Sequence, residues 1–400
     1  MKFDTIKLSE LATIQTGPFG SQLHKEDYVV HGTPIVTVEH LGDRKFTEQN
    51  LPCVSDKDKE RLKKYILKTG DIVFSRVGSV DRCSYVSAEY EGWLFSGRCL
   101  RVRPCEKLNP KYLYYFFSLE ETKQFVRNIA TGATMPSINT KFMGEIPIRV
   151  PSLETQNKIA SILWMIDDKI ELNEKINKNL EQQIELILLK TINDADTQPV
   201  KLGDYLYIKG RIGWKGLKKS EYLPVSDYRI INGESLTLSG IDWNKAGYIS
   251  AERYEESPEI MLNIGDILLS KDGTIGKIGY VDKLETPTSV ASGIFVIRNT
   301  RQAEISTQFI YYLLKSRLFK AFITSRTEGS VIPHLYQKDF TEFEFQLPSP
   351  DDMKTFDDTT AAMFSMVFSN LNENERLIHL RDSLLPKLMS GELDISDIDL

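Results

Sequence analysis

The chain contains a long internal repeat, and this feature constrains its fold more than any other. When residues 112–190 are aligned without a gap with residues 309–387, at an offset of 197, 15 of the 79 pairs are identical. Glycine, proline and asparagine fix turns and registers, so a shared backbone should retain them. The identical pairs include Gly132/Gly329, Pro136/Pro333 and Asn173/Asn370. A period this long exceeds that of any solenoid repeat, so the sequence predicts one large unit present twice.

Each copy of the repeat divides into a globular part and a long helix. Upstream of the aligned helices the offset is 195, which pairs residues 68–86 with residues 263–281. Both segments carry a Gly-Asp turn followed by a short apolar run, GDIVFS or GDILLS, which is typical of a turn that enters a strand. We expect further strands over 93–103 and 292–298, so the globular parts are predicted to be mainly β. The fold class is therefore α+β, with the order module, helix, module, helix.

A shorter helix is expected at the end of each globular part, over 110–129 and over 307–325. Each contains a tyrosine doublet, Tyr114-Tyr115 and Tyr311-Tyr312. Stacking of these rings on a ligand is one interpretation, but aromatic residues at helical spacing more often belong to the core. We interpret them as core residues.

The two long helices show clear start signals and an imperfect heptad pattern. Ser152 and Ser349 stand where an N-cap is expected, and Pro350 follows at the first helical position. Heptads counted from Ile159 predict the same a row in both helices. The predicted a positions are Ile159, Ile166, Asn173, Leu180 and Ile187, then Phe356, Met363, Asn370, Leu377 and Leu384.

The d row of this heptad is interrupted by polar side chains. Ile162, Ile176, Met366 and Leu380 occupy d positions, whereas Lys169, Gln183, Thr359 and Glu373 break the row. We expect a seam that needs additional partner helices. Asn173 and Asn370 both fall at an a position, where a buried asparagine specifies register; the alternative is that each faces solvent on a loosely packed helix.

The charge of the chain is unevenly distributed. The formal net charge is −6, and residues 342–400 carry −9, which leaves +3 for the rest. The segment 201–220 holds six Lys and Arg residues against the single acid Asp204. A basic loop of this kind contacts phosphate in nucleic-acid-binding proteins, and a solvated surface is the equally acceptable alternative.

Motifs for catalysis and metal binding are absent from the sequence. It contains no GxxxxGK[ST], GxSxG or HExxH motif and no amino-methyltransferase signature. The five histidines lack metal-ligand spacing, and the four cysteines form no CxxC pair. We therefore expect no catalytic residue and no metal site. The first residues lack the apolar core of a signal peptide and no apolar run approaches membrane-spanning length, so we interpret the protein as cytoplasmic.

Taken together, these segments resemble the specificity (S) subunits of type I restriction-modification systems, the HsdS family. The resemblance is carried by KLSELATIQTGPFGS at the start, TGDIVFSRVG and IGDILLSKDG in the modules, PSLETQNKIASILWMIDDKIELNEKIN at the centre and LRDSLLPKLMSGEL near the end. It covers essentially all 400 residues. Each piece alone is a weak signal, whereas the set is specific.

The resemblance implies a division of the chain and a set of partners. Residues 1–150 and 193–347 would be target-recognition domains that each read one half of an asymmetric bipartite DNA target. Residues 151–192 and 348–400, the latter with an acidic tail, would hold spacer helices that pack as an antiparallel coiled coil. The helices would dock two methyltransferase (M) subunits, and two restriction/translocase (R) subunits would complete the complex. S-adenosylmethionine, ATP and Mg would be bound by those partners, and no cofactor by this chain. A non-enzymatic scaffold without base readout is the alternative function, and a metal-dependent nuclease using Asp351, Asp352 and Asp357 is a more distant one.

Candidate DNA-contacting residues are polar side chains on predicted loops, chosen at matching places in the two modules. Base readout needs arginine or lysine for guanine and phosphate, and amide or hydroxyl side chains for other edges. In the first module they are Ser21, Gln22, Lys25, Arg76, Ser79, Arg82, Thr134 and Ser137. In the second they are Lys209, Arg211, Lys215, Lys218, Lys271, Thr274, Lys277, Ser330, His334 and Tyr336. For Arg76 and Lys271, which follow equivalent strands, pairing with a carboxylate of their own module is the structural alternative.

Overall fold

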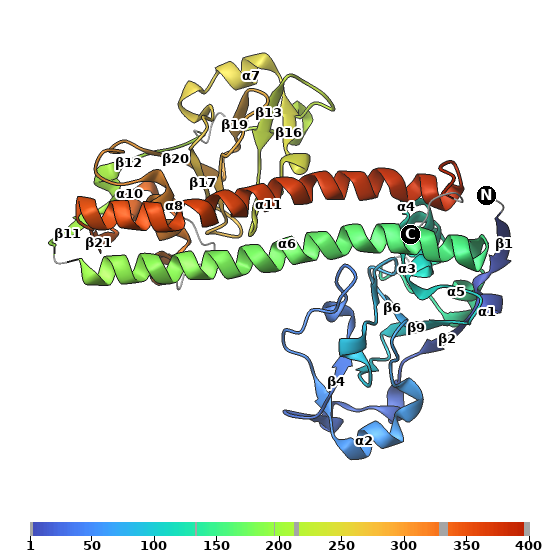
Figure 1. Cartoon of the computed structure of the whole chain (residues 1–400). Coiled ribbons are helices and arrows are strands. Elements are labelled where there is room, and N and C mark those ends of the chain that lie inside the picture. The colour runs from blue at the N-terminus through green and yellow to red at the C-terminus, as the bar shows by residue number, and fades with distance from the viewer. Residues whose placement is uncertain (1–2, 133, 196, 212–215, 328–334, 396–400) are drawn as a thin grey trace. The chain divides into compact units, whose positions relative to one another are not determined.

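The computed structural model describes residues 3–132, 134–195, 197–211, 216–327 and 335–395, apart from the side chains of Ser21 and Lys25. The chain forms two compact units. Unit 1 comprises Met1–Ile170 with Arg376–Leu400, and unit 2 comprises Glu171–Glu375. Two long helices, α6 (Leu153–Asp194) and α11 (Pro350–Ser390), each contribute residues to both units (Figure 1).

Unit 1 contains two small four-stranded sheets and one two-stranded sheet among its described residues. The first four-stranded sheet has the order β2-β9-β6-β7, all neighbours antiparallel, and the second has the order β3-β5-β4-β8, in which β4 and β8 are parallel. Strands β1 and β10 pair separately. The strands are β1 (Asp4–Lys7), β2 (Ala12–Thr16), β3 (Tyr28–Val29), β4 (Thr33–Val36), β5 (Cys53–Val54), β6 (Ile72–Ser75), β7 (Cys83–Tyr85), β8 (Leu94–Phe95), β9 (Cys99–Pro104) and β10 (Pro147–Val150).

Helices and two apolar clusters complete unit 1. The larger cluster joins the inner faces of β6 and β9 to the aromatic residues of α3 and to residues from both long helices, and the smaller one lies under β4 and β8. Tyr114 and Tyr115 are buried in the larger cluster, as predicted. The helices are α1 (Leu8–Leu11), α2 (Asp56–Arg61), α3 (Pro110–Ser118), α4 (Glu120–Ile129) and α5 (Thr140–Gly144).

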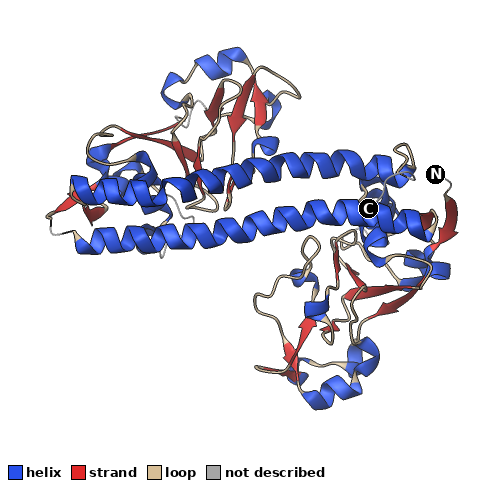
Figure 2. Cartoon of the chain, in the orientation of Figure 1, coloured by secondary structure: helices blue, strands red, loops and turns tan. Residues whose placement is uncertain are grey.

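Unit 2 repeats the main sheet of unit 1 and its two-stranded pair, with β11 and β21 in the places of β1 and β10, and the two units differ in the second sheet (Figure 2). Its four-stranded sheet β12-β20-β17-β18 matches β2-β9-β6-β7, and a three-stranded sheet β16-β13-β19 stands beside two-stranded pairs. The strands are β11 (Pro199–Lys201), β12 (Leu206–Gly210), β13 (Tyr228–Ile231), β14 (Leu236–Thr237), β15 (Gly240–Ile241), β16 (Gly247–Ile249), β17 (Ile267–Ser270), β18 (Ile278–Tyr280), β19 (Thr288–Val290), β20 (Ile294–Asn299) and β21 (Glu344–Gln346). The helices are α7 (Ala251–Glu255), α8 (Thr307–Lys315), α9 (Arg317–Thr327) and α10 (Gln337–Thr341).

Each predicted short helix is interrupted in the structure. The segment from 110 breaks between α3 and α4 at Leu119, whose backbone is extended, and two glutamates open the first turn of α4. The segment from 307 breaks between α8 and α9 at Ser316, whose hydroxyl accepts a hydrogen bond from the Phe319 N–H at 3.4 Å. The single continuous helices expected from the sequence were therefore wrong at this point. A capping side chain and a first-turn acid favour a new helix start over continuation.

The long helices begin where the sequence predicts. The Ser152 hydroxyl accepts the Thr155 N–H at 3.2 Å, and the Ser349 hydroxyl accepts the Asp352 N–H at 3.2 Å. Both serines are thus N-caps that satisfy an amide without a helical partner. Within the part of the chain that the structure describes, no helix is long and apolar enough to cross a membrane.

The buried seam of the long helices uses the predicted a row and a different second row. In α6 the second buried row lies four residues after each a position and not three, so Leu163, Ile170, Asn177 and Ile184 are buried. In α11 the same shift buries Thr360, Val367, Asn374 and Leu388 and half-buries Arg381. Met366 and Leu380, which we expected in the seam, are 51% and 46% exposed. The d row was therefore assigned one residue too early.

Four asparagines form a polar layer between α6 and α11 in unit 2. The Asn173 amide donates to Asn374 Oδ1 at 2.8 Å, and the Asn370 amide donates to Asn177 Oδ1 at 2.8 Å. At the repeat offset of 197, Asn173 is equivalent to Asn370 and Asn177 is equivalent to Asn374, so the two hydrogen bonds are equivalent to each other. From Asn173 to Asn177 the residue numbers of α6 increase, while the numbers of their partners in α11 decrease from 374 to 370, so the helices run antiparallel here. The solvent-facing alternative for Asn173 is excluded by its complete burial.

Unit 1 joins the same two helices through a charged network. The Asp167 carboxylate accepts hydrogen bonds from Arg381 Nη1 at 2.8 Å and from the Tyr115 hydroxyl at 2.5 Å. Asp167 is 7% exposed. The next residue, Asp168, forms an ion pair with Arg44, whose guanidinium carbon lies 3.9 Å from the centroid of the Trp164 ring. The globular part of unit 1 is thereby fixed to its helices by both charge and packing.

Candidate nucleic-acid interface

The loop that leaves β6 is held in place by main-chain hydrogen bonds. Arg76 donates its N–H to the Arg98 carbonyl at 2.8 Å, and its own carbonyl accepts the Ile138 N–H at 3.0 Å. Ser75, the last residue of β6, donates its hydroxyl to the Val77 carbonyl at 2.7 Å. These bonds tie three separate segments of unit 1 together at Arg76.

Unit 2 builds the same backbone arrangement after β17. Lys271 donates its N–H to the Gly293 carbonyl at 2.9 Å, and its carbonyl accepts the Leu335 N–H at 3.1 Å. Ser270 again donates its hydroxyl to a loop carbonyl, that of Thr274, at 2.7 Å. Arg76 and Lys271 are therefore equivalent by hydrogen bonding as well as by sequence. Arg98 and Gly293 are equivalent on the same grounds.

The side chains of Arg76 and Lys271 lie close to aromatic rings, and that of Arg76 also contacts the main chain. Arg76 Nη1 donates to the Gly97 carbonyl at 3.1 Å, and its guanidinium carbon lies 5.9 Å from the centroid of the exposed Phe19 ring. Lys271 Nζ lies 4.9 Å from the centroid of the Phe295 ring. Among the described residues no carboxylate pairs with either cation, which argues against the structural alternative of an ion pair.

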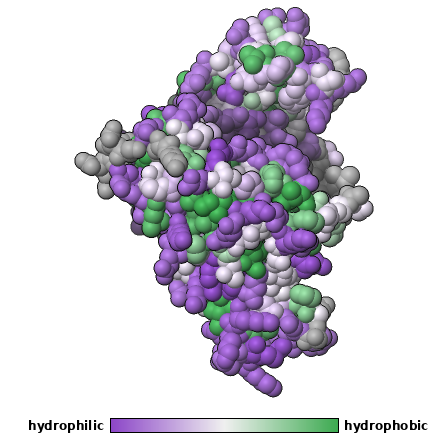
Figure 3. Space-filling view, turned by 90° about the vertical axis from the view of Figure 1, so that its right-hand side faces the viewer, coloured by the Kyte–Doolittle hydropathy of each residue, from purple (hydrophilic) through white to green (hydrophobic). Residues whose placement is uncertain are grey.

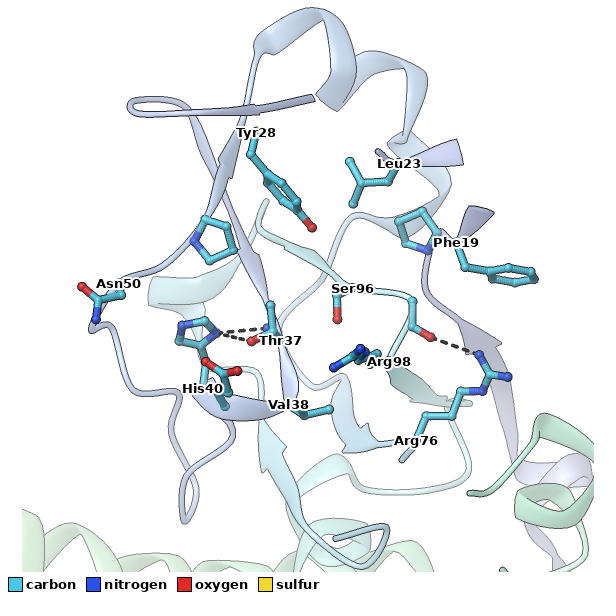
Figure 4. Close-up of a pocket in the computed structure, with 14 residues that line it drawn as sticks. Phe19, Leu23, Tyr28, Thr37, Val38, His40, Asn50, Arg76, Ser96 and Arg98 are labelled. Carbon is cyan, nitrogen blue, oxygen red and sulfur yellow. Dashed lines mark hydrogen bonds between the residues drawn. The ribbon is translucent and has the colours of Figure 1, made fainter. Parts of the chain in front are cut away.

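A cavity of about 590 Å³ opens beside Arg76 in unit 1 (Figure 4). The short helix η3 (Val38–His40) forms one wall, and the turn from Ser96 to Arg98 lies opposite Asn50 in the close-up. Burial raises the pKa of Tyr28, with a contribution from Asp27, so its hydroxyl remains a proton donor at neutral pH. The lining residues are Pro18, Phe19, Leu23, Tyr28, Thr37, Val38, Glu39, His40, Asn50, Pro52, Arg76, Ser96, Gly97 and Arg98.

The remaining predicted residues of unit 1 fall into two groups. Ser79, Arg82 and Thr134 are exposed. Gln22 and Ser137 are engaged within the unit: the Gln22 carbonyl accepts Arg61 Nη1 at 2.6 Å and its side chain accepts the Tyr65 hydroxyl, while the Ser137 hydroxyl donates to the Thr131 carbonyl at 3.3 Å. The side chains of Ser21 and Lys25 lie outside the described part.

Arg211 corrects one of the sequence expectations. It is 2% exposed, and its Nε and Nη2 donate to the Val290 carbonyl at 3.2 Å and to the Ser289 hydroxyl at 3.3 Å. Burial lowers the pKa of this guanidinium, and the neighbouring Arg253 adds to the effect. The expectation that Arg211 lies on an exposed loop was therefore wrong. Its charge is placed inside the unit, where carbonyl and hydroxyl oxygens satisfy it.

The other predicted residues of unit 2 are mostly at the surface. Lys277 is half-buried and donates its ammonium to the Gly233 carbonyl at 2.7 Å. The exposed residues are Lys209, Lys218, Thr274 and Tyr336. Lys215, Ser330 and His334 lie outside the described residues.

Several polar residues of the cavity were missed by the sequence reasoning. Arg98, Glu39 and Asn50 line it, and none of them stood in the predicted loops. One signal was available for Arg98, because the repeat aligns it with Gly293 beside a strand that both modules share. In the described residues no group of three or more histidine, cysteine, aspartate or glutamate side chains is placed to hold a metal ion.

Comparison with known proteins gives one consistent family. The model for the type I restriction modification DNA specificity domain matches residues 1–182 and again 195–378. The chain is 26% identical over 398 residues to the putative type I restriction enzyme MjaX specificity subunit of Methanocaldococcus jannaschii, covering 91% of this chain and 88% of that one. It is 23% identical over 448 residues to the type I restriction enzyme HindI specificity subunit of Haemophilus influenzae, covering 90% and 95%.

A solved structure shares the fold. The S subunit of a type I restriction-modification system from M. genitalium superposes with a TM-score of 0.60 at 17% sequence identity, covering 97% of this chain and 96% of that one. At this identity the likeness concerns the fold alone. The two matched segments of the family model correspond to the two copies of the internal repeat.

Proposed function

Because the chain belongs to the family of type I restriction-modification specificity subunits, a non-catalytic class, we propose that each of its globular modules reads one half of a bipartite DNA target. One observation carries the proposal. Arg76 and Lys271 have the same main-chain hydrogen bonds in the two units, while the side chains on that shared backbone differ. A common frame with different side chains is what two unlike half-sites require, since base edges are distinguished by donor and acceptor patterns.

The exposed candidates of the two modules are basic or hydroxyl residues, which suits contact with phosphate and base edges. Arg82, Lys209 and Lys218 supply positive charge, and Ser79 and Thr274 supply hydroxyl groups. The net negative charge of the chain lies instead in its last part, residues 342–400. We assign the DNA-facing role to the loops after β6 and β17 and to their neighbours.

The long helices are proposed to dock two methyltransferase subunits. Their outward faces carry apolar side chains that the unit does not cover: in unit 2, Leu172 and Leu186 of α6 are 52% and 64% exposed and Met366 of α11 is 51% exposed. Green apolar areas interrupt the hydrophilic surface in Figure 3. Exposed apolar residues at a helix surface are suited to packing against partner helices. Two R subunits would complete the assembly, and S-adenosylmethionine, ATP and Mg would be bound by the partners.

Sequencing of methylated DNA tests the reading function. Cells that express this chain with its cognate methyltransferase should carry methylated adenine in a motif with two unlike halves separated by a fixed gap. Deletion of the gene should remove that motif. A single uninterrupted motif, or methylation that persists after deletion, would contradict the proposal and favour a scaffold without base readout.

The assembly is tested separately by native mass spectrometry. Mixing the chain with an excess of the methyltransferase subunit should give a complex with two methyltransferase chains per copy. A complex that saturates at one to one would contradict a twofold docking surface.

A further inference from the structure

The cavity of unit 1 has a rigid floor made by close approach of two main-chain segments. A side-chain carbon added at Gly17 would lie 2.1 Å from the Ser96 carbonyl oxygen, and one added at Gly97 would lie 2.4 Å from the Pro18 carbonyl oxygen. Only glycine fits such contacts. The Cys99 N–H closes the turn on the Ser96 carbonyl at 2.9 Å. Arg98 is therefore presented from a fixed backbone.

The opposite wall is equally well fixed. Helix η3 is capped by His40, whose Nδ1 accepts the Thr37 N–H at 3.1 Å, while its Nε2 lies 3.2 Å from the Gln49 carbonyl. His40 is 4% exposed and acts as a positioning residue for this turn. Glu39, inside the turn, is exposed and lines the cavity.

The two charged side chains of these walls are not used by the unit itself. The Arg98 guanidinium stands near the middle of the cavity in Figure 4. Among the described residues, neither the Arg98 guanidinium nor the Glu39 carboxylate has a hydrogen-bond or ion-pair partner, although both line the same cavity. A cation and an anion that stand on hydrogen-bonded backbone and have no partner within the unit are suited to a ligand that presents an acceptor pair beside a donor.

A G·C base pair has this pattern in the major groove. Guanine offers its O6 and N7 as an acceptor pair that matches a guanidinium, and cytosine offers its N4 amino group as a donor to a carboxylate. An A·T pair lacks the purine acceptor pair, because adenine offers the single acceptor N7 to a guanidinium, and its amino donor N6 stands on the purine beside N7 and not on the pyrimidine. Arg76, at the edge of the cavity, leaves the net charge positive, which favours the approach of DNA.

We propose that Arg98 and Glu39 read one G·C base pair in the half-site of the first module. This inference rests on the proposed function. The second module has Gly293 where the first has Arg98, on the same hydrogen-bonded backbone, so it lacks this reading group. This reading pair is therefore assigned to the half-site of the first module only.

The test uses the complete methyltransferase complex and a library of DNA targets randomised in both half-sites. Relative methylation rates are measured for the wild type, for Arg98→Ala and for Glu39→Gln. The matched control is Lys63→Ala, which removes one positive charge from an exposed residue of the same unit that pairs with Glu60 outside the cavity. Arg98→Ala should reduce the preference for G·C at one position of one half-site on the order of 10- to 100-fold. Glu39→Gln should weaken the preference at that position, while Lys63→Ala should leave the motif unchanged.

Other outcomes have distinct meanings. If Arg98→Ala and Glu39→Gln leave the relative rates unchanged, the cavity does not read a base. If Arg98→Ala slows methylation of all sequences equally and lowers the salt dependence, Arg98 contacts phosphate and the inference is also overturned. If Arg98→Ala fails to assemble, Arg98→Gln is measured in its place by the same criteria. A wild-type complex without any bipartite motif would instead contradict the proposed function itself.

Discussion

The ion pair of the buried Asp167 with the half-buried Arg381 in unit 1 has no charged counterpart in unit 2, and the equivalent residues of unit 2 indicate which apolar side chains could replace it. At the offset of 197, Asp167 corresponds to Phe364 and Arg381 corresponds to Ile184. Both of these residues belong to the apolar cluster of unit 2. Removing one member of a buried ion pair is strongly destabilising, whereas replacing both members by apolar residues is often neutral or stabilising. Unit 1 thus has an ion pair at this position, and unit 2 has two apolar side chains at the equivalent position.

We predict that Asp167→Phe alone lowers the free energy of unfolding of unit 1 by about 2–4 kcal/mol, because Arg381, whose side chain is 29% exposed, would keep only the more exposed Asp382 as its ion-pair partner. Arg381→Ile alone should cost a similar amount, because the 7%-exposed carboxylate would lose its cation. The double variant should lie within roughly 1–2 kcal/mol of the wild type, because the gain from apolar packing offsets a Tyr115 hydroxyl left without its acceptor. The equivalent Tyr312 hydroxyl in unit 2 is likewise buried without a partner.

The assay is a double-mutant cycle measured by urea unfolding and by hydrogen exchange of peptides from unit 1. Tryptophan fluorescence includes a signal from this site, because the ring centroid of Trp164 lies 6.1 Å from that of Tyr115. Hydrogen exchange separates unit 1 from unit 2, which should be unaffected. If the double variant is less stable than either single variant, the charged network is not exchangeable for the packing of unit 2 and the reasoning is refuted.

Three further predictions concern spacing, the interior and cysteine chemistry. Inserting four residues after Asn177 lengthens α6 by about 6 Å and should widen the gap of the methylated motif by about one or two base pairs with both halves unchanged; altered halves with a constant gap would show that the helices do not set the spacing. Arg211→Ala should lower the free energy of unfolding by about 2–4 kcal/mol in urea titrations without changing the motif, since the buried oxygens around it lose their donors; a changed motif at full stability would contradict this. Burial raises the pKa of Cys99 to about 12, so its thiol stays protonated at pH 8. Iodoacetamide should therefore modify Cys99 at least on the order of 100-fold more slowly than the exposed Cys105, as followed by mass spectrometry, and equal rates would contradict its burial.

The architecture was predictable because its signals are local or periodic. The N-cap serines and the repeat itself are properties of neighbouring residues or of one fixed offset, and both are confirmed. The second row of the helix seam was missed for a physical reason. Its members in α11 include Thr360, Asn374 and Arg381, which look like surface residues, while the exposed Met366 looks like a core residue. Polarity alone misplaces a seam whose polar groups are satisfied by a partner helix.

The candidate site was less predictable because burial depends on distant segments. Arg211 and Arg98 are both arginines near strand ends, yet one is buried and the other exposed. The difference arises from Ser289 and Val290, which approach Arg211 from 78 and 79 residues away. No local pattern around either arginine contains that information. The main-chain frame at Arg76 and Lys271, by contrast, was visible in the repeat.

The antiparallel pairing of α6 with α11 also has a consequence for synthesis on the ribosome. Asn173 bonds to Asn374, a residue 201 positions later, and unit 1 buries Leu388 and Met389 in its main apolar cluster. At about 5–20 residues per second, the apolar face of α6 therefore waits on the order of 10–40 s for its partner helix after it leaves the ribosome. The module that is made first is completed last, so the nascent chain presents an open hydrophobic seam that a chaperone can shield and that an interrupted translation product would keep.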